Sequence, residues 1–381
     1  MCRNTFRNKL VRNEIQQSLS KNPTNKALRT LGEIKPSWGE GAPTVIKFIQ
    51  PVKPDAAKGL VADVYAQIKR DFGKIVEPFQ LHSPCPKLLA GAWMACRETE
   101  LVGNVPRPIK EVVAAAVSQL NHCPYCVDAH TIMLSAAGES HIADALSKAR
   151  YENIADEKIF TLTQWALATT SPRSELLRWS PISKQEAPEI IGTAVFYHYL
   201  NRMANALLGT TPLPTSQSWL KSPMKRVAVS MFSDAVRRPK RVGDSLQLLP
   251  REELPNDLRW AKAQANVAQA YACFASAVEE AGEQALPEEV RAHVTQELSE
   301  WTGKTSELSL AWYEDAITRF DEATEAAAKL TLQVALAPHR IEENSILAFR
   351  KHFPQDEKLL GALSWASFAA ARKIGSWLHQ P

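Results

Sequence analysis

The stretch PIKEVVAAAVSQLNHCPYCVDAHTIMLSAAG, residues 108–138, decides how the sequence around it is interpreted. Its first part places valine, alanine and leucine at helical spacing, which predicts a helix over about 108–120 with one apolar side. The second part predicts another helix that opens at Cys123 and ends just before Gly138. We therefore expect a fold built from short consecutive helices.

The same helical spacing continues on both sides of this stretch, from about residue 55 almost to the C-terminus. Alternating runs bounded by hairpin turns, which would predict strands, are not found in the sequence. A length of 381 residues exceeds one ordinary core of ~100–200 residues, so we expect two domains or a duplicated one. The sequence predicts an all-α protein.

Composition and charge narrow the classes of function. Hydrophobic residues make up 45% and charged residues 23%, and no apolar run reaches the ~18–20 residues that span a bilayer. The net charge of +4 is mild, and the basic clusters in residues 1–30 and 237–241 lack interleaved aromatic residues. No apolar stretch of a secretory signal peptide follows Met1. We expect a cytoplasmic protein that binds neither nucleic acid nor membrane.

Three segments recur about 170 residues later in the same order, which predicts an internal duplication. The pairs are Thr161–Ala168 with Thr331–Ala337, Glu189–Gly192 with Lys358–Gly361, and, at a slightly longer spacing, Glu111–Leu120 with Glu289–Leu298. The predicted organisation is a basic N-terminal arm (1–54), a catalytic domain (55–210), a Pro-rich basic linker with one helix around 225–236 (211–255) and a degenerate repeat (256–381).

Cys123 and Cys126 are the only two of the six cysteines close enough in sequence to act as a local pair. Their spacing fits the Cα separation of a disulfide, and Cys123 lies at a helix start, where free N–H groups and the helix dipole favour a thiolate. On a helix, Cys126 and His130 lie four positions apart and share one face. A tight turn would bring Glu111 of the preceding helix against them. Thiol, imidazole and carboxylate together predict a proton relay that activates a sulfur nucleophile.

Other interpretations of the cysteine pair stay open at this point. A structural metal site would need a second pair of soft ligands, for which Cys85 with His82 is a poor substitute. A haem attachment needs a histidine directly after the second cysteine, where Val127 stands, and thioredoxin chemistry needs a βαβ context. The pair is interpreted first as a redox dithiol. The alternative is a non-catalytic helical scaffold whose cysteines sense redox state or bind a metal.

The spacing of Glu111, Cys123, Cys126 and His130, with eleven, two and three residues between them, resembles a known signature. It is similar to that of the carboxymuconolactone decarboxylase-like superfamily, in its alkylhydroperoxidase D branch. Upstream, the resemblance includes Val64-Tyr65, Phe72-Gly73, Pro78, His82-Ser83-Pro84 and Trp93. The specific resemblance covers about residues 55–140, and the helical repeat carries it weakly to the C-terminus.

The resemblance implies an all-helical bundle that assembles into a homo-oligomer and acts as a peroxiredoxin-type alkylhydroperoxidase without a cofactor or a bound metal. By the same resemblance, Cys126 attacks the hydroperoxide and Cys123 resolves the sulfenic acid into a disulfide. His130 and Glu111 relay the proton. A partner dithiol protein, lipoylated or thioredoxin-like, then reduces the disulfide. The second copy is expected to be degenerate, because its corresponding stretch near 301–306 contains no cysteine.

Three further residues are weaker candidates for lining the site. His82 precedes two prolines and could lie at the site mouth or serve a turn. His122 adjoins Cys123 and, when charged, could lower the pKa of that thiol. Tyr125 stands between the cysteines, where the best-studied members of the branch carry a second histidine, and we expect this difference to affect peroxidase efficiency.

Overall fold

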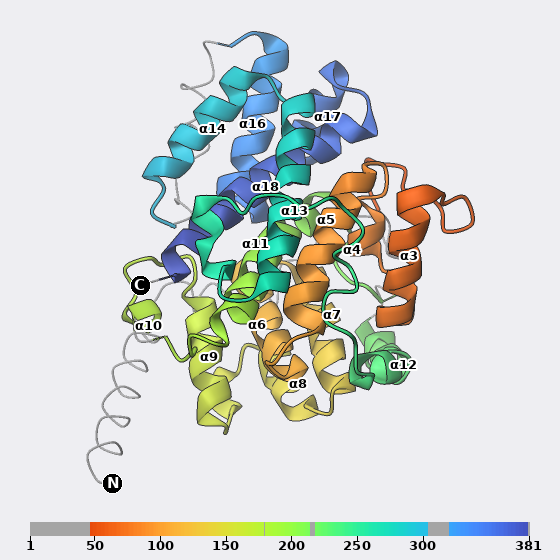
Figure 1. Ribbon diagram of the computed structural model, residues 1–381, viewed down its shortest axis with the longest axis vertical. Coiled ribbons are helices and arrows are strands. Elements are labelled where there is room, and N and C mark those ends of the chain that lie inside the picture. The colour runs from red at the N-terminus through yellow and green to blue at the C-terminus, as the bar shows by residue number, and fades with distance from the viewer. Residues whose placement is uncertain (1–45, 179, 214–217, 304–319, 380–381) are drawn as a thin grey trace. The chain divides into compact units, whose positions relative to one another are not determined.

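The computed structural model describes residues 46–178, 180–213, 218–303 and 320–379, and these residues form helices and no β-strand (Figure 1). The prediction of an all-α fold is confirmed. The described helices belong to one compact unit, residues 42–381. The predicted basic arm lies largely outside the described residues, as does the second half of the 301–306 stretch.

The helices of the first half follow one another with short connections. They are α3 (Gly59–Phe72), α4 (Glu77–Gln80), α5 (Pro86–Cys96), the π-helical turn η2 (Arg97–Leu101), α6 (Arg107–Leu120), α7 (Pro124–Ala136), α8 (Ser140–Ser147), η3 (Tyr151–Asn153), α9 (Glu157–Leu167), α10 (Glu175–Arg178) and α11 (Ala187–Leu207). The helices of the remaining chain are α12 (Ser218–Arg237), η4 (Asn256–Ala261), α13 (Ala265–Ala285), α14 (Glu288–Glu300), α16 (Glu322–Leu336), η5 (Pro338–Arg340), α17 (Glu343–His352) and α18 (Asp356–Leu378).

The two helices expected over 108–138 form as the sequence predicts. Proline lies in the first turn of both α6 and α7, where its missing N–H costs no helical hydrogen bond. Gly138, just after α7, has a φ of 107°, which a residue with a side chain rarely adopts. Glycine can therefore end α7 at this point without backbone strain.

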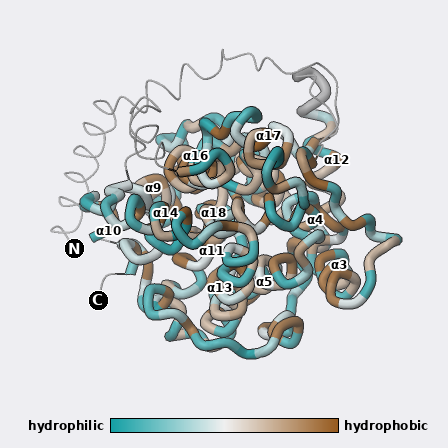
Figure 2. Tube along the Cα trace, turned by 90° about the horizontal axis from the view of Figure 1, so that it is seen from above, coloured by the Kyte–Doolittle hydropathy of each residue, from teal (hydrophilic) through white to brown (hydrophobic). Residues whose placement is uncertain are grey.

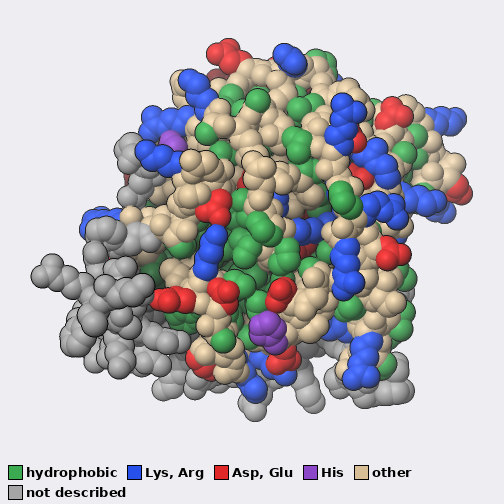
Figure 3. All heavy atoms as spheres, turned by 60° about the horizontal axis from the view of Figure 1, so that its bottom comes forward, with side chains coloured by type: hydrophobic (Ala, Val, Ile, Leu, Met, Phe, Trp, Pro, Cys, Tyr) green, Lys and Arg blue, Asp and Glu red, His purple; other side chains and the backbone are tan. Residues whose placement is uncertain are grey.

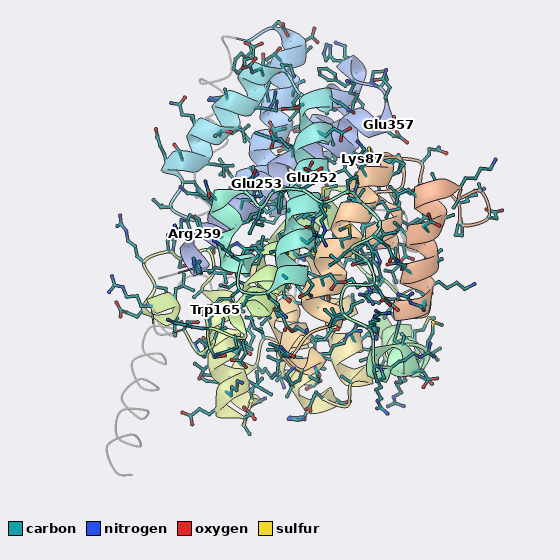
Figure 4. The ribbon with its side chains drawn as sticks, in the orientation of Figure 1. Lys87, Trp165, Glu252, Glu253, Arg259 and Glu357 are labelled. Atoms are coloured by element: carbon teal, nitrogen blue, oxygen red, sulfur yellow. The ribbon has the colours of Figure 1, made fainter. Side chains whose placement is uncertain are left out.

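The long helices α11, α13 and α18 hold the two halves together. α18 packs against both α11 and α13, and α13 also packs against α5. Figure 1 shows these three helices between α14, α16 and α17 at one end and α6 to α9 at the other. A Cβ at Gly361 of α18 would clash with the carbonyl oxygen of Ala281 on α13, so glycine permits this close crossing. One apolar cluster includes residues of both halves, such as Trp165 of α9 (labelled in Figure 4) and Phe368 of α18.

The repeated segments lie on helices in the same order in both halves. The first pair ends α9 and α16, the second begins α11 and α18, and the third lies on α6 and α14. A duplicated unit would have this arrangement, although the duplication itself and the predicted domain boundaries stay predictions.

The segment predicted as a linker is more structured than expected. α12 begins at Ser218, ahead of the helix predicted around 225–236, and contains Pro223. It packs against α7 and α3, with the Lys225 ammonium 3.0 Å from the hydroxyl of Thr131 and the Arg237 guanidinium 3.2 Å from the carbonyl oxygen of Ala136. The apolar contacts that order this helix come from elements distant in sequence, which composition alone does not reveal.

Apolar and polar residues are mixed along the helices and over the surface (Figure 2, Figure 3). Within the described residues, no helix combines the length and apolar character needed to cross a membrane. Figure 2 shows short hydrophobic and hydrophilic stretches alternating along the helices. On the face seen in Figure 3, lysine and arginine side chains are interspersed with acidic, polar and apolar groups.

Candidate active site

The turn between α6 and α7 determines which residues of the two helices meet. The backbone N–H of Cys123 donates to the carbonyl of Ser118 at 2.9 Å, and that of His122 donates to Gln119 at 3.0 Å. His122 has a φ of 50°, a left-handed conformation that histidine adopts more readily than most residues other than glycine. The chain reverses here within a few residues, so α6 and α7 run antiparallel.

This reversal brings the Glu111 carboxylate against the His130 imidazole, with Oε2 2.8 Å from Nδ1. Both residues are buried, and Arg107, one turn earlier on α6, donates its Nε–H to the other carboxylate oxygen at 2.9 Å. Burial alone would raise the pKa of Glu111, but Arg107 and His130 outweigh burial and lower it to about 2. An ionised Glu111 accepts the Nδ1–H bond, which leaves Nε2 of the neutral imidazole as the nitrogen that can take a proton.

The two predicted redox cysteines lie together at the start of α7. Their sulfur atoms are 2.9 Å apart, and the residues are 1% and 2% exposed. Burial raises the pKa of the Cys126 thiol well above its ordinary value. Because a disulfide bond is ~2.05 Å long, oxidation of this pair needs only a small further approach of the sulfurs.

The structure joins the four predicted residues as two pairs. Glu111 contacts His130, and Cys123 contacts Cys126. Cys126 and His130 are one helical turn apart on α7, but no hydrogen bond joins them in the described part of the chain. The sulfur of Cys126 instead has a hydrogen bond with Asn201 of α11, which lowers the pKa of this thiol but by less than burial raises it.

His82 lies in the core rather than at a site mouth. It is fully buried, with Nδ1 2.9 Å from the carbonyl oxygen of Pro78 and Nε2 2.6 Å from the hydroxyl of Tyr199. Burial lowers the pKa of His82 to about 4, so the ring is neutral. Its partner Tyr199 follows 117 positions later, which is why sequence reasoning could not separate this role from a site-lining one.

The other two weak candidates flank the cysteines. His122 is half-buried and its ring centroid lies 5.0 Å from that of His339, which comes from the second half. Burial lowers the pKa of His122, which disfavours a charged ring beside Cys123. Tyr125 is buried and donates its hydroxyl to the carboxylate of Glu77 on α4 at 3.0 Å. Tyr125 therefore ties the dithiol segment to α4.

Sequence reasoning missed a second carboxyl group beside His130. Glu100 lies in η2 and is 1% exposed. Its Oε2 accepts hydrogen bonds from the hydroxyl of Tyr197 and, at 3.3 Å, from the thiol of Cys96. The ring of Tyr197 also packs edge-on against His130, with centroids 4.3 Å apart. The polar residues within the buried helix α11 could have suggested Tyr197 as a site residue. No sequence pattern near Glu100 suggests that it lies in the site.

Asn201 is the other residue that sequence reasoning missed. It is fully buried on α11, donates to the hydroxyl of Ser118 at 3.0 Å and accepts from Asn121, also at 3.0 Å. These bonds fix the carboxamide that meets Cys126. The dithiol thus touches a rigid polar group from the helix that links the two halves.

Within the described residues, the side chains with metal-ligand chemistry that gather in one place are Glu100, Glu111 and His130, whose ligand atoms lie within 4.8 Å of one another. Neither Cys123 nor Cys126 belongs to this cluster. The residues around the cysteine pair therefore give no support to its interpretation as a metal-binding site.

An all-helical fold with a buried dithiol beside a glutamate–histidine pair defines a protein of the carboxymuconolactone decarboxylase type. The model of the carboxymuconolactone decarboxylase family matches residues 87–147. An alkyl hydroperoxide reductase of Mycobacterium tuberculosis is 36% identical over 333 residues, which cover 87% of this chain and 95% of that protein. The chain belongs to this family, in its alkylhydroperoxidase D-like branch.

A solved structure is also similar to part of the chain. It is the alkylhydroperoxidase AhpD core of an uncharacterized peroxidase-related protein from Ralstonia eutropha JMP134, with 20% sequence identity and a TM-score of 0.37. The match covers 50% of this chain and 100% of the solved chain.

Proposed function

We propose that the protein reduces hydroperoxides with the Cys123–Cys126 dithiol. The observation that carries this proposal is a pair of buried sulfurs 2.9 Å apart, placed one helical turn from an imidazole that is hydrogen-bonded to an ionised carboxylate. The M. tuberculosis relative, named an alkyl hydroperoxide reductase, supports the same chemistry.

In the first half of the proposed reaction, Cys126 becomes the attacking sulfur. Because burial raises the pKa of this thiol, it needs a base, and Nε2 of His130 takes the proton. The thiolate attacks one peroxide oxygen, the O–O bond breaks, and the leaving alkoxide receives the proton from His130. The products are an alcohol and the sulfenic acid of Cys126. Glu111 stays ionised and holds the imidazole in the required tautomer.

In the second half, the sulfur of Cys123 attacks the sulfenic acid of Cys126. A water molecule leaves with the proton of the Cys123 thiol, and the disulfide forms. Two electrons and two protons from a dithiol protein, lipoylated or thioredoxin-like, restore both thiols. A homo-oligomer in the cytoplasm is part of the same proposal.

A single-turnover experiment tests this function. Reduced protein is mixed with one equivalent of an organic hydroperoxide, and peroxide, free thiols and disulfide-linked peptides are measured. We expect one peroxide to be consumed, two thiols per chain to be lost, and Cys123 to be linked to Cys126. Persistence of both peroxide and thiols would instead support the non-catalytic scaffold.

A further inference from the structure

Glu100 places a second carboxyl group beside the histidine of the relay, His130. Its Oε1 has no hydrogen-bond partner within the described residues and lies 3.9 Å from Nδ1 of His130, the atom that Glu111 contacts at 2.8 Å. Its Oε2 is already occupied by Tyr197 and Cys96. One imidazole nitrogen is therefore flanked by two carboxyl groups, both sealed from water.

Titratable side chains from several neighbouring helices surround the Glu100 carboxyl group. The titratable groups that face Glu100 are Cys96 from α5, Arg107 and Glu111 from α6, His130 from α7 and Tyr197 from α11. On α13, Tyr271 directs its hydroxyl to the carbonyl of Gly192 instead. Arg107 is the one fixed cation in this group, and its Nε–H is bonded to Glu111.

One cation can balance one of the two carboxylates. Two carboxylates that share a buried site cannot both ionise easily, because each disfavours the charge on the other and no water screens them. Arg107 and the Nδ1–H of His130 select Glu111 as the ionised member. Glu100 receives only neutral donors, the hydroxyl of Tyr197 and the thiol of Cys96.

We propose that Glu100 carries a proton and keeps the Glu111–His130 pair at a single negative charge, which makes Glu100 a positioning residue of the relay. In this state the imidazole stays neutral and Nε2 can take the thiol proton. If this proton moved to His130 instead, the ionised Glu100 would lie 3.9 Å from Nδ1 and stabilise an imidazolium that cannot accept the thiol proton. Burial and the Glu111 carboxylate both raise the pKa of Glu100, in agreement with this geometry.

A bound divalent cation is the competing explanation for the unpartnered Oε1. Glu100, Glu111 and His130 offer suitable ligand atoms. The guanidinium of Arg107 is bonded to the same Glu111 carboxylate, however, and a second cation would be repelled there. The geometry therefore favours a proton over a metal ion.

This inference deepens the proposed function, and its test uses a reaction that needs no peroxide. Reduced protein is mixed with 4,4′-dithiodipyridine, and the rate at which the dithiol reacts is followed from pH 5 to 10 in the wild type and in Glu100→Gln. Because glutamine is neutral like a protonated Glu100, we expect the two profiles to coincide within about twofold, whereas removal of an ionised Glu100 would displace the acid limb to lower pH by about one unit or more. Glu111→Gln is the matched control and should be slower throughout, by about tenfold or more.

A second variant keeps the test decisive if Glu100→Gln does not fold. Tyr197→Phe removes a donor that would stabilise an ionised Glu100 and keeps the ring against His130, so its profile should also follow that of the wild type. An acid limb displaced to lower pH in Glu100→Gln, or a uniform loss like that of Glu111→Gln, would overturn the proposal. Stoichiometric zinc or manganese in the purified protein would also overturn it. A protein that consumes no hydroperoxide but shows the expected profiles would contradict the proposed function alone.

Discussion

The two halves of the described chain carry helices in the same order, but the residues of only one half form a relay. On α6, Glu111 is fully buried and bonded to His130. On α14, its counterpart Glu289 is exposed, and burial is confined to Val290, His293, Val294 and Leu298. The same residue type at the matching position of the predicted repeat thus lies in two different environments, one buried and one exposed. A carboxylate can orient an imidazole only where packing removes water and supplies a partner.

The central helices α11 and α18 differ in the polar side chains that they bury. α11 directs the polar groups of Tyr197 and Asn201 toward the site. α18 buries small hydroxyl residues such as Ser364 and Ser367, which lie against Met203 of α11. The second half therefore contributes packing that holds α11 in place, and α11 contributes the polar groups. Four predictions test this division, in order of decreasing effect.

The largest effect is expected at the dithiol. Cys126→Ser should abolish turnover, because no thiolate remains in the activated position. Cys123→Ser should consume about one equivalent of peroxide and stop at the Cys126 sulfenic acid, since the resolving sulfur is missing. Trapping of sulfenic acid followed by mass spectrometry distinguishes the two. A trapped sulfenic acid on Cys123 in Cys126→Ser, with none on Cys126 in Cys123→Ser, would reverse the roles.

The second prediction compares the two halves of the chain directly. Glu111→Gln and His130→Ala should slow sulfenic acid formation by about 10²–10⁴-fold, the usual contribution of a general base. Glu289→Gln, at the corresponding place in the second half, should leave the rate unchanged because its carboxylate is exposed. Stopped-flow measurement of the first oxidation step gives all three rates. An equal loss in Glu289→Gln would remove the distinction between the halves.

The sequence predicts the part of the site that depends on neighbouring residues along the chain. It does not predict the part that depends on contacts between distant segments. The α6–α7 hairpin was predicted closely because its signals are local: helical spacing, proline at each start and Gly138 at the end. The approach of Glu111 to His130 follows from that hairpin, since only 19 positions separate them.

Contacts between distant segments were beyond this kind of reasoning. Glu100 meets Tyr197 across 97 positions, and no local pattern distinguishes it from the neighbouring glutamate, Glu98. Glu98 is bonded instead to Arg97 and, across 147 positions, to Ser245. The helix expected around 225–236 forms within α12, but its earlier start was not predicted, because α12 packs against the distant helices α3 and α7.

The third prediction uses acid to test the burial of Glu111. Its pKa is lowered from 4.5 to about 2 in the folded protein, so its stabilising effect is complete above pH ~5 and is lost as the pH falls toward 2. The difference in unfolding free energy between the wild type and Glu111→Gln should therefore shrink by about 3 kcal/mol between pH 7 and 2. Urea unfolding at several pH values measures it, with Glu289→Gln, which removes an exposed carboxylate, as the control. A difference independent of pH would show that Glu111 is not ionised by its partners.

The smallest effect is expected where the halves meet at the surface. Lys87 of α5, labelled in Figure 4, lies with its Nζ 2.7 Å from the carboxylate of Glu280 on α13. The two side chains are 61% and 44% exposed, so water already solvates both charges, and ordering two long side chains opposes the attraction. Beneath them, a Cβ at Gly91 would lie 3.0 Å from the Cα of Phe274, which shows how closely the two helices pack. A double-mutant cycle with Lys87→Ala and Glu280→Ala should give a coupling of about 0.5 kcal/mol that weakens with salt. A coupling above about 1.5 kcal/mol would mean that surface charge, rather than the packed faces of α5 and α13, joins the half that carries the chemistry to the half that supports it.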